Sequence, residues 1–277
     1  YTIDMISRRL APKIREALSD TPVVLIGGAR QVGKSTLAKA VSSARYMTFD
    51  DLDILEAAVS DPIGFVDSLP EQVILDEIQR VPELMLPIKA SVDRNRTPGR
   101  FLLTGSANVL LLPKLADSLA GRMGVFTLYP LSQLELEGRE GTFIDRIFAR
   151  DFSIRDFSSK GSEASVLERI ITGGYPEALT RGATRREVWF EDYVRTFVQR
   201  DVRDLSNITG LVDFSRLLRL LALRTSTVLN QADVARDAAL NAVTFKRYYT
   251  LLEASYLLHS LPAWFFNPHK RLVKAPK

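Results

Sequence analysis

The chain contains 277 residues, of which 46% are hydrophobic and 25% charged, with no cysteine and a formal net charge of +4. These values are ordinary for a globular protein, and they exclude a disordered tail protein, a collagen-like chain, a disulfide-stapled miniprotein and thiol catalysis. No run approaches the roughly 18 consecutive apolar residues of a membrane span and no signal-peptide pattern opens the sequence, so we expect a cytoplasmic protein without a membrane partner.

Hydrophobic periodicity predicts an α/β arrangement in the first half of the chain. A helix over residues 4–20, which contains Pro12, precedes a short apolar strand at Val23–Ile26. Further strands are predicted at Arg45–Phe49, Val73–Leu75, Phe101–Thr104 and Val125–Leu128, and further helices at 34–43, 52–59, 83–95 and 109–119. Strands that alternate with helices indicate a parallel sheet with helices on both faces.

The predicted strands stop after about Glu137. Residues 139–165 are predicted to form a polar surface connection, and helices follow at 165–171, 185–206, 211–224, 231–239 and 242–254. Strand character at Tyr256–Leu261, Trp264–Phe266 and Arg271–Val273 then gives the outline of a winged helix-turn-helix. We therefore expect a core at 1–137, a helical lid or connector at 138–208 and a winged helix at 209–277.

The strongest motif is Gly-Ala-Arg-Gln-Val-Gly-Lys-Ser-Thr, which fits the phosphate-loop pattern G-x-x-x-x-G-K-[ST] between a strand and a helix. Glycines let the backbone N–H groups surround the phosphates, and the helix N-terminus adds partial positive charge. Lys34 is predicted to reach the β- and γ-phosphates, and the Ser35 hydroxyl to ligate Mg²⁺. The predicted nucleotide contacts are Gly28, Ala29, Arg30, Gln31, Val32, Gly33, Lys34, Ser35 and Thr36. A chance match in a glycine-rich turn is the alternative.

Two carboxylates end the apolar strand at Val73–Leu75. Asp76 is predicted to hold Mg²⁺, and Glu77 to polarise the attacking water as a general base. A helix N-terminus that happens to carry two acids is the alternative. The adjacent glutamate indicates a hydrolysing ATPase, and the absence of a guanine-reading Asn/Thr-Lys-x-Asp motif favours adenine.

Polar residues also follow the strand at Phe101–Thr104. Because the carboxyl ends of parallel strands line the ligand crevice, we expect Thr104, Ser106 or Asn108 to sense the γ-phosphate or to orient the water, with strand-end capping as the alternative. Arg122 follows a glycine and is predicted to approach a phosphate, either in its own chain or in a neighbouring copy of a homo-oligomer. A cation that complements a helix dipole is the alternative for Arg122.

These motifs together resemble a known family. The residues that carry the resemblance are 28–36, Ile-Leu-Asp-Glu-Ile-Gln-Arg-Val-Pro-Glu-Leu at 74–84, Phe-Leu-Leu-Thr-Gly-Ser-Ala-Asn at 101–108, Ser-Leu-Ala-Gly-Arg at 118–122, Pro-Leu-Ser-Gln-Leu-Glu-Leu at 130–136 and Gly-Gly-Tyr-Pro-Glu-Ala-Leu at 173–179. They resemble the bacterial and archaeal AAA+-type ATPases described as AAA_14 ATPases with a DUF4143 domain. The resemblance implies an AAA+-like core, a helical segment, a winged-helix region and then a nuclease-like domain, of which this chain lacks the acidic and lysine residues.

The basic residues concentrate near the carboxyl end of the chain. Residues 211–277 carry a net charge of +6, whereas residues 1–210 carry −2. The tentative DNA contacts are Thr244, Lys246 and Arg247 on the second helix of the helix-turn-helix, and Lys270 and Arg271 on the wing. Asn241 is predicted to cap that second helix.

Two functions are consistent with these features. The first is an ATPase that binds Mg²⁺-ATP and hydrolyses ATP while it acts on, or is regulated by, duplex or branched DNA. The alternative is a nucleotide-controlled signalling or scaffold ATPase whose winged helix docks a protein.

Overall fold

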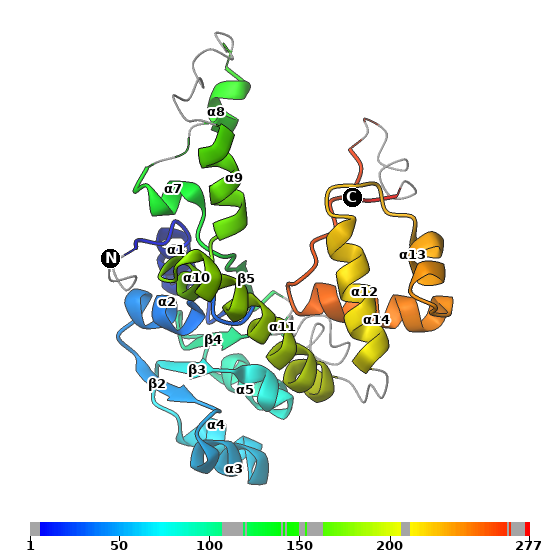
Figure 1. The fold of residues 1–277 in the computed structure, drawn as a ribbon. Helices are drawn as coiled ribbons and strands as arrows, with labels where there is room; N and C mark the ends of the chain where they lie inside the picture. Colours follow the sequence, from blue (N-terminus) through cyan, green and yellow to red (C-terminus); the bar gives the residue numbers. More distant parts are fainter. Residues whose placement is uncertain are drawn as a thin grey trace. The chain divides into compact units, whose positions relative to one another are not determined.

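The computed structural model describes residues 6–106, 119, 121–139, 141, 143–149, 153, 163–205, 211–264, 266 and 275–277 (Figure 1). The chain divides into two compact units, residues 1–187 and 188–277, and each is described by itself. In the described part of the chain, no helix is long and apolar enough to cross a membrane. The expected division into a core at 1–137, a helical connector at 138–208 and a winged helix at 209–277 stays a prediction.

A five-stranded parallel sheet forms the centre of the first unit. Its strand order is β2-β3-β4-β1-β5, with β1 at Val23–Gly27, β2 at Arg45–Thr48, β3 at Val73–Asp76, β4 at Phe101–Gly105 and β5 at Met123–Thr127. Every residue of β1, β3 and β4 is buried, as expected for strands that helices cover on both faces. The predicted parallel sheet is therefore confirmed, and each strand begins and ends within two residues of its predicted position.

Helices surround the sheet and extend beyond it. They are α1 (Ala11–Asp20), α2 (Lys34–Val41), α3 (Leu52–Ser60), α4 (Pro62–Ser68), α5 (Met85–Arg94), α7 (Gln133–Leu136), α8 (Phe143–Ile147), α9 (Glu163–Thr172) and α10 (Pro176–Leu179), together with the 3-10 helices η2 (Ile78–Arg80) and η3 (Pro82–Leu84). Helix α11 (Ala183–Leu205) begins in the first unit and continues into the second. The prediction of a helix from residue 4 is wrong for its described start, because the helix begins at Ala11. Pro12 stands in the first turn of α1, where its fixed φ suits a helix start and its missing N–H costs nothing.

The strands present alternate residues to the two faces of the sheet. On one face, Leu25, Leu75 and Leu103 belong to a core that includes buried side chains of α3, α4 and α5. On the other face, α1 and α2 contact β1 (Figure 1). This arrangement leaves the carboxyl ends of β1, β3 and β4 together at one edge, where open parallel sheets bind ligands.

Three helices follow α11 in the second unit: α12 (Leu211–Leu223), α13 (Gln231–Asp237) and α14 (Ala242–Ala254). Their core includes Phe214, Val234 and Phe245, all buried. The side chain of Asn241 accepts a hydrogen bond of 2.8 Å from the backbone N–H of Thr244, which confirms the predicted cap of α14.

The strand predicted at Tyr256–Leu261 is wrong, since these residues form a turn and an irregular segment after α14, which ends at Ala254. Tyr256 has a φ of +59°, and the N–H groups of Leu257 and Leu258 both donate to the carbonyl of Leu252. These bonds satisfy the last turn of the helix, so the same groups are not free to form a strand ladder. The predicted return strand at 271–273 lies outside the described residues.

Two backbone contacts nevertheless join separate segments of this unit. Leu261 and Lys277 exchange hydrogen bonds of 2.8 and 2.9 Å, and the N–H of Leu229 donates to the carbonyl of Pro276 at 2.9 Å. The segment that precedes α13 and the segment that follows α14 are therefore both paired with residues 276–277.

Candidate functional site

The loop between β1 and α2 has the backbone geometry of an anion-binding loop. Gly33 has a φ of +92°, in the left-handed region that favours glycine. At Gly28 a Cβ atom would lie 2.3 Å from the carbonyl oxygen of Leu128, so only glycine fits there. The first N–H groups of α2, which begins at Lys34, have no intrahelical partner and are available to an anion.

Lys34 lies across this loop. Its side chain is buried, and Nζ donates a hydrogen bond of 2.9 Å to the carbonyl oxygen of Ala29 at the other end of the loop. A buried ammonium group is costly without strong partners. Lys34 is therefore held where it can exchange a carbonyl for the oxygens of a phosphate.

Asp76, the last residue of β3, is surrounded by hydroxyl groups. Ser35 Oγ donates to both carboxylate oxygens, at 2.9 and 3.1 Å, and Thr104 at the end of β4 donates to Oδ1. Tyr46 of β2 donates to Oδ2 at 2.5 Å. The structure thus brings Ser35, Asp76 and Thr104 together at the carboxyl ends of neighbouring strands.

The hydroxyl of Tyr46 is strongly affected by this position. Burial, followed by the hydrogen bond to Asp76 and its negative charge, raises the pKa of Tyr46 to about 12. The amine of Lys39 lies 3.7 Å from the centre of the tyrosine ring. Sequence reasoning missed Tyr46, which is the second residue of β2 and lies opposite Ile74, so no rule for strand ends selects it.

Glu77 follows Asp76 with a φ of +60°, which is unusual for a residue with a side chain. Ser106 Oγ donates to Glu77 Oε2 at 3.1 Å, and the amide of Gln79 also contacts this oxygen. Gln79 further donates to Ser106 Oγ at 2.9 Å and accepts from the N–H of Ser106 at 3.2 Å. The Glu77 carboxylate is therefore held by two polar residues, one of which, Gln79, sequence reasoning did not select.

The structure does not bring Arg122 to this site. Arg122 precedes β5 and its carbonyl accepts from the N–H of Val23, so it lies at the amino ends of the strands. Its Nε donates to Asp93 of α5. A role for Arg122 at its own nucleotide is thus wrong for this arrangement, because the phosphate loop is at the opposite edge of the sheet. A role in a neighbouring copy stays a prediction, and Asn108 lies outside the described residues.

The residues selected for DNA binding divide between the described and undescribed parts of the chain. Lys246 and Arg247 are exposed on α14 and Thr244 is half-buried, whereas Lys270 and Arg271 lie outside the described residues. A shallow hollow on α14 is lined by Ala242, Val243, Lys246, Arg247, Thr250 and Leu251. The surface of α14 therefore combines two cations with exposed aliphatic groups, of which Val243 is 81% exposed.

Comparison with known proteins adds a family to this geometry. Residues 20–137 match the AAA domain family, and residues 163–277 match a domain of unknown function, DUF8612. The domain matched after the core is thus DUF8612, and the expected DUF4143 domain stays a prediction.

Two uncharacterized proteins, one from Mycobacterium tuberculosis and one from Mycobacterium bovis, are each 31% identical over 277 residues, 99% of this chain and 57% of theirs. The chain therefore spans little more than half the length of these curated relatives. The Walker-type ATPase paby2304 of Pyrococcus abyssi, at 18% identity and a TM-score of 0.56, has a similar fold over 100% of this chain and 94% of that chain. Residues 20–137, which contain this phosphate loop and the parallel sheet, thus match the AAA domain family, and the chain has a fold similar to that of a Walker-type ATPase.

Proposed function

We propose that the chain binds Mg²⁺-ATP at residues 28–36 and hydrolyses it. The observation that carries the proposal is the pair Ser35–Asp76, whose hydroxyl and carboxylate oxygens are 2.9 Å apart beside the buried amine of Lys34. One hydroxyl and one carboxylate fit Mg²⁺, which the protein usually holds through few side chains and which takes further oxygens from phosphates and water. Ser35 and Asp76 would hold Mg²⁺, whose positive charge would offset the negative charge of the phosphates.

The residues of the chain then have separate roles in hydrolysis. The N–H groups of the loop and Lys34 hold the phosphates, and Glu77 accepts a proton from the water that attacks the γ-phosphate. Thr104, fully buried, donates to Asp76 and keeps its carboxylate oriented toward Ser35. In this proposal Thr104 acts through Asp76, and it does not touch the γ-phosphate.

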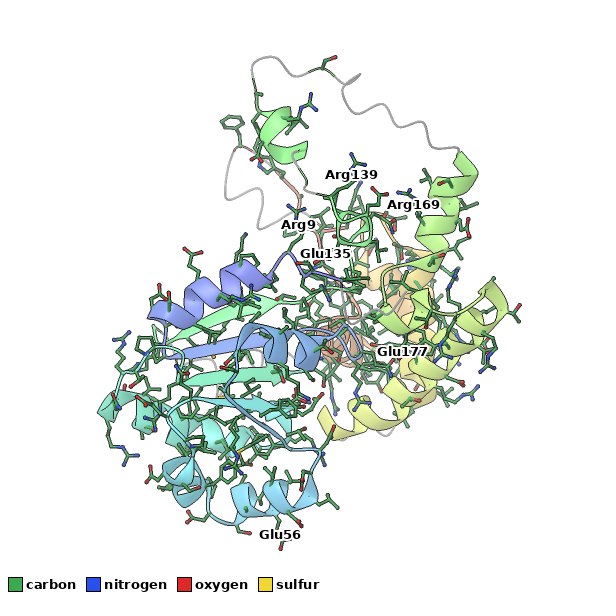
Figure 2. The ribbon with its side chains drawn as sticks, turned by 90° about the vertical axis from the view of Figure 1, so that its left-hand side faces the viewer. Arg9, Glu56, Glu135, Arg139, Arg169 and Glu177 are labelled. Carbon is green, nitrogen blue, oxygen red and sulfur yellow. The ribbon has the colours of Figure 1, made fainter. Side chains whose placement is uncertain are left out.

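The experiment is ATP hydrolysis by the chain and by Glu77→Gln. We expect the substitution to lower the hydrolysis rate by at least about 10²-fold, the range for removal of a general base, while ATP binding persists. The matched control is Glu56→Gln, which changes an exposed glutamate of α3 (Figure 2). Undiminished hydrolysis by Glu77→Gln would remove the role of Glu77, and absence of nucleotide binding by the wild-type chain would overturn the whole proposal.

We further infer that the second unit is a winged helix-turn-helix that contacts DNA phosphates through α14. The order α12, α13, α14 supports this inference, as do the backbone bonds that pair residues 276–277 with Leu229 and Leu261. Residues 211–277 carry a net charge of +6, and Lys246 and Arg247 are exposed on the helix that such modules place against DNA.

A salt titration of duplex and branched DNA binding tests this inference. Reversing the charges of Lys246 and Arg247 to glutamate is expected to weaken binding and to reduce the slope of log affinity against log salt by about two. The control Arg219→Glu/Arg236→Glu makes the same change in net charge on α12 and α13. Equal effects of the two double variants would contradict a specific role for α14.

The aliphatic groups of the hollow on α14 favour the second candidate, a winged helix that docks a protein. Val243→Ser distinguishes the two functions, because it removes an exposed aliphatic group and retains both cations. DNA-stimulated hydrolysis that survives Val243→Ser supports DNA as the partner. Hydrolysis indifferent to DNA would favour the protein-docking function.

A further inference from the structure

We propose that Arg8 is a positioning residue of the nucleotide site: it fixes the orientation of the Val32–Gly33 peptide in the phosphate loop. Arg8 precedes α1, and the three acceptors of its side chain lie 24, 121 and 127 residues away in sequence. Its NH1 donates to the carbonyl of Val32 at 2.8 Å, its NH2 to the carbonyl of Tyr129 at 2.6 Å, and its Nε to Glu135 at 3.2 Å. The inference rests on the proposed function, since it names a residue that prepares the same loop.

Burial and hydrogen bonds through all three guanidinium nitrogens fix the side chain of Arg8. It is 11% exposed, and each of the three nitrogens donates to a protein oxygen. These bonds use three of the five N–H donors and orient a group that remains charged at all relevant pH values. The role proposed for Arg8 is exerted through the loop backbone, because Arg8 donates to the carbonyl of Val32.

Because the Val32–Gly33 peptide is trans, the bond from Arg8 to its carbonyl also sets the direction of its N–H group. The carbonyl of Val32 and the N–H of Gly33 belong to one planar peptide and point in opposite directions. The structure contains no cis peptide bond among the described residues, so this relation holds here. When Arg8 holds the carbonyl of Val32, the N–H of Gly33 is directed away from the guanidinium. Gly33 has a φ of +92°, and because glycine lacks a Cβ atom its backbone has access to many conformations, so an external hold on this peptide has a real effect.

The segment that follows β5 also contacts the start of the phosphate loop. The N–H of Leu128 donates to the carbonyl of Gly27 at 2.7 Å, and the carbonyl of Leu128 packs against Gly28. Residues 128–135 therefore contact the start of the phosphate loop directly and its end through Arg8. We call residues 128–135 the loop support.

Glu135 anchors Arg8 to the loop support. Its side chain, 7% exposed, also accepts from the backbone N–H groups of Arg9 and Ser132, both at 2.9 Å, and Figure 2 shows Arg9 and Glu135 close together. Burial alone raises the pKa of Glu135, but these two bonds and the charge of Arg8 outweigh it, so the pKa lies below the usual glutamate value. An ionised Glu135 thus fixes both Arg8 and the backbone next to it.

Residues Gly173–Pro176, part of the segment that carries the family resemblance, also contact the loop support. The N–H of Leu131 donates to the carbonyl of Gly174 at 2.7 Å, and a Cβ atom on Gly174 would lie 2.0 Å from the carbonyl oxygen of Leu131. Only glycine allows this close approach of two backbones. The loop support is thereby fixed on two sides, by Arg8 and by this turn, and can serve as a rigid base for the phosphate loop.

The test compares Arg8→Ala with Arg15→Ala, a matched control on α1 whose exposed guanidinium donates to the carbonyl of Ala40 at 3.2 Å. Titration of the full chain with a fluorescent ADP analogue gives the Kd, and steady-state hydrolysis gives kcat and KM. We expect Arg8→Ala to raise the Kd and KM at least about tenfold with little change in kcat, because hydrogen bonds from a charged donor have this weight. Arg15→Ala is expected to leave all three values unchanged.

Two additional measurements keep the outcome decisive. Arg8→Lys replaces Arg8→Ala in the comparison if Arg8→Ala is poorly folded. Its single ammonium cannot reach all three acceptors, so Arg8→Lys should have only part of the wild-type affinity. Hydrogen exchange of the peptide that covers residues 28–36, without nucleotide, should be faster in Arg8→Ala than in Arg15→Ala. Unchanged exchange and unchanged Kd in folded Arg8→Ala would overturn the inference. Failure of the wild-type chain to bind nucleotide would overturn the proposed function, and the exchange measurement would still decide whether Arg8 orders the loop.

Discussion

The hydroxyl of Tyr46 donates a 2.5 Å hydrogen bond to Oδ2 of Asp76. The two residues lie on neighbouring parallel strands, with Tyr46 opposite Ile74 and Thr48 opposite Asp76. Ser35 and Thr104 also donate to Asp76, so its carboxylate has hydroxyl donors from three different segments. A carboxylate held in this way is oriented before any nucleotide arrives, which lowers the reorganisation that binding requires.

Replacing Tyr46 with phenylalanine is expected to lower the free energy of unfolding by about 1.5 kcal/mol at pH 7, because it removes a hydrogen bond to a charged acceptor. The raised pKa also predicts a pH dependence. The unfolded chain ionises this phenol near pH 10, whereas the folded chain keeps the proton up to about pH 12. Its contribution is thus present below pH 10 and lost as the pH rises toward 12. Urea unfolding should show a shallower decline for Tyr46→Phe than for wild type in this interval, with Tyr129→Phe as an exposed control.

The sequence predicts well those parts of the structure that depend on local pattern. Short apolar runs locate the five strands, and the rule for carboxyl ends of parallel strands is enough to expect Ser35, Asp76 and Thr104 near each other. The cap of α14 is also local, because Asn241 and Thr244 are three residues apart.

Other features depend on contacts that no local pattern encodes. The hydroxyl of Tyr46 reaches Asp76 only because β2 pairs with β3, and Arg8 meets its partners across 24, 121 and 127 residues. The strand predicted at Tyr256–Leu261 fails for the opposite reason, since the local requirement to cap α14 prevails over strand propensity. Sequence reasoning predicted that Arg122 approaches a phosphate because it follows a glycine, but a residue just before a parallel strand lies at the edge opposite the carboxyl ends.

Gln79 is expected to influence the chemical step through Glu77. Gln79→Ala removes a partner of the Glu77 carboxylate and of Ser106, so we expect kcat to fall about tenfold, the weight of one hydrogen bond to a charged group, with unchanged Kd for ADP. The control Gln72→Ala changes an exposed glutamine just before β3. A rise in kcat would instead mean that Gln79 and Ser106 hold Glu77 away from the attacking water.

Lys34 is expected to couple ATP binding to stability. A ligand that binds only the folded state at 100 times its Kd stabilises that state by about 2.7 kcal/mol, which thermal unfolding detects as a higher Tm. Lys34→Ala should lose most of this increase in Tm, because it removes the amine assigned to the phosphates. In the structure that amine is buried and donates to the carbonyl of Ala29. Its Tm without ATP should not fall, since the variant no longer buries an ammonium group. Lys13→Ala, an exposed position on α1, should retain the full increase, and a full increase in Lys34→Ala would contradict the assigned role.

The ionisation of Glu135 is expected to make the stability of the first unit fall at acidic pH. Its pKa is lowered in the folded state, so its contribution to stability is present above the usual value of about 4.5 and is lost as the pH falls through the folded-state pKa. Glu135→Gln leaves Arg8 as a buried charge without its carboxylate, and we expect a loss of about 3 kcal/mol at pH 7, the lower limit for breaking a buried ion pair. Below the folded-state pKa the wild-type chain has lost the same interaction, so the two unfolding free energies should converge. Glu177→Gln, an exposed change on α10, should parallel wild type throughout (Figure 2). A constant difference between Glu135→Gln and wild type at every pH would show that the charge of Glu135 is not what holds Arg8.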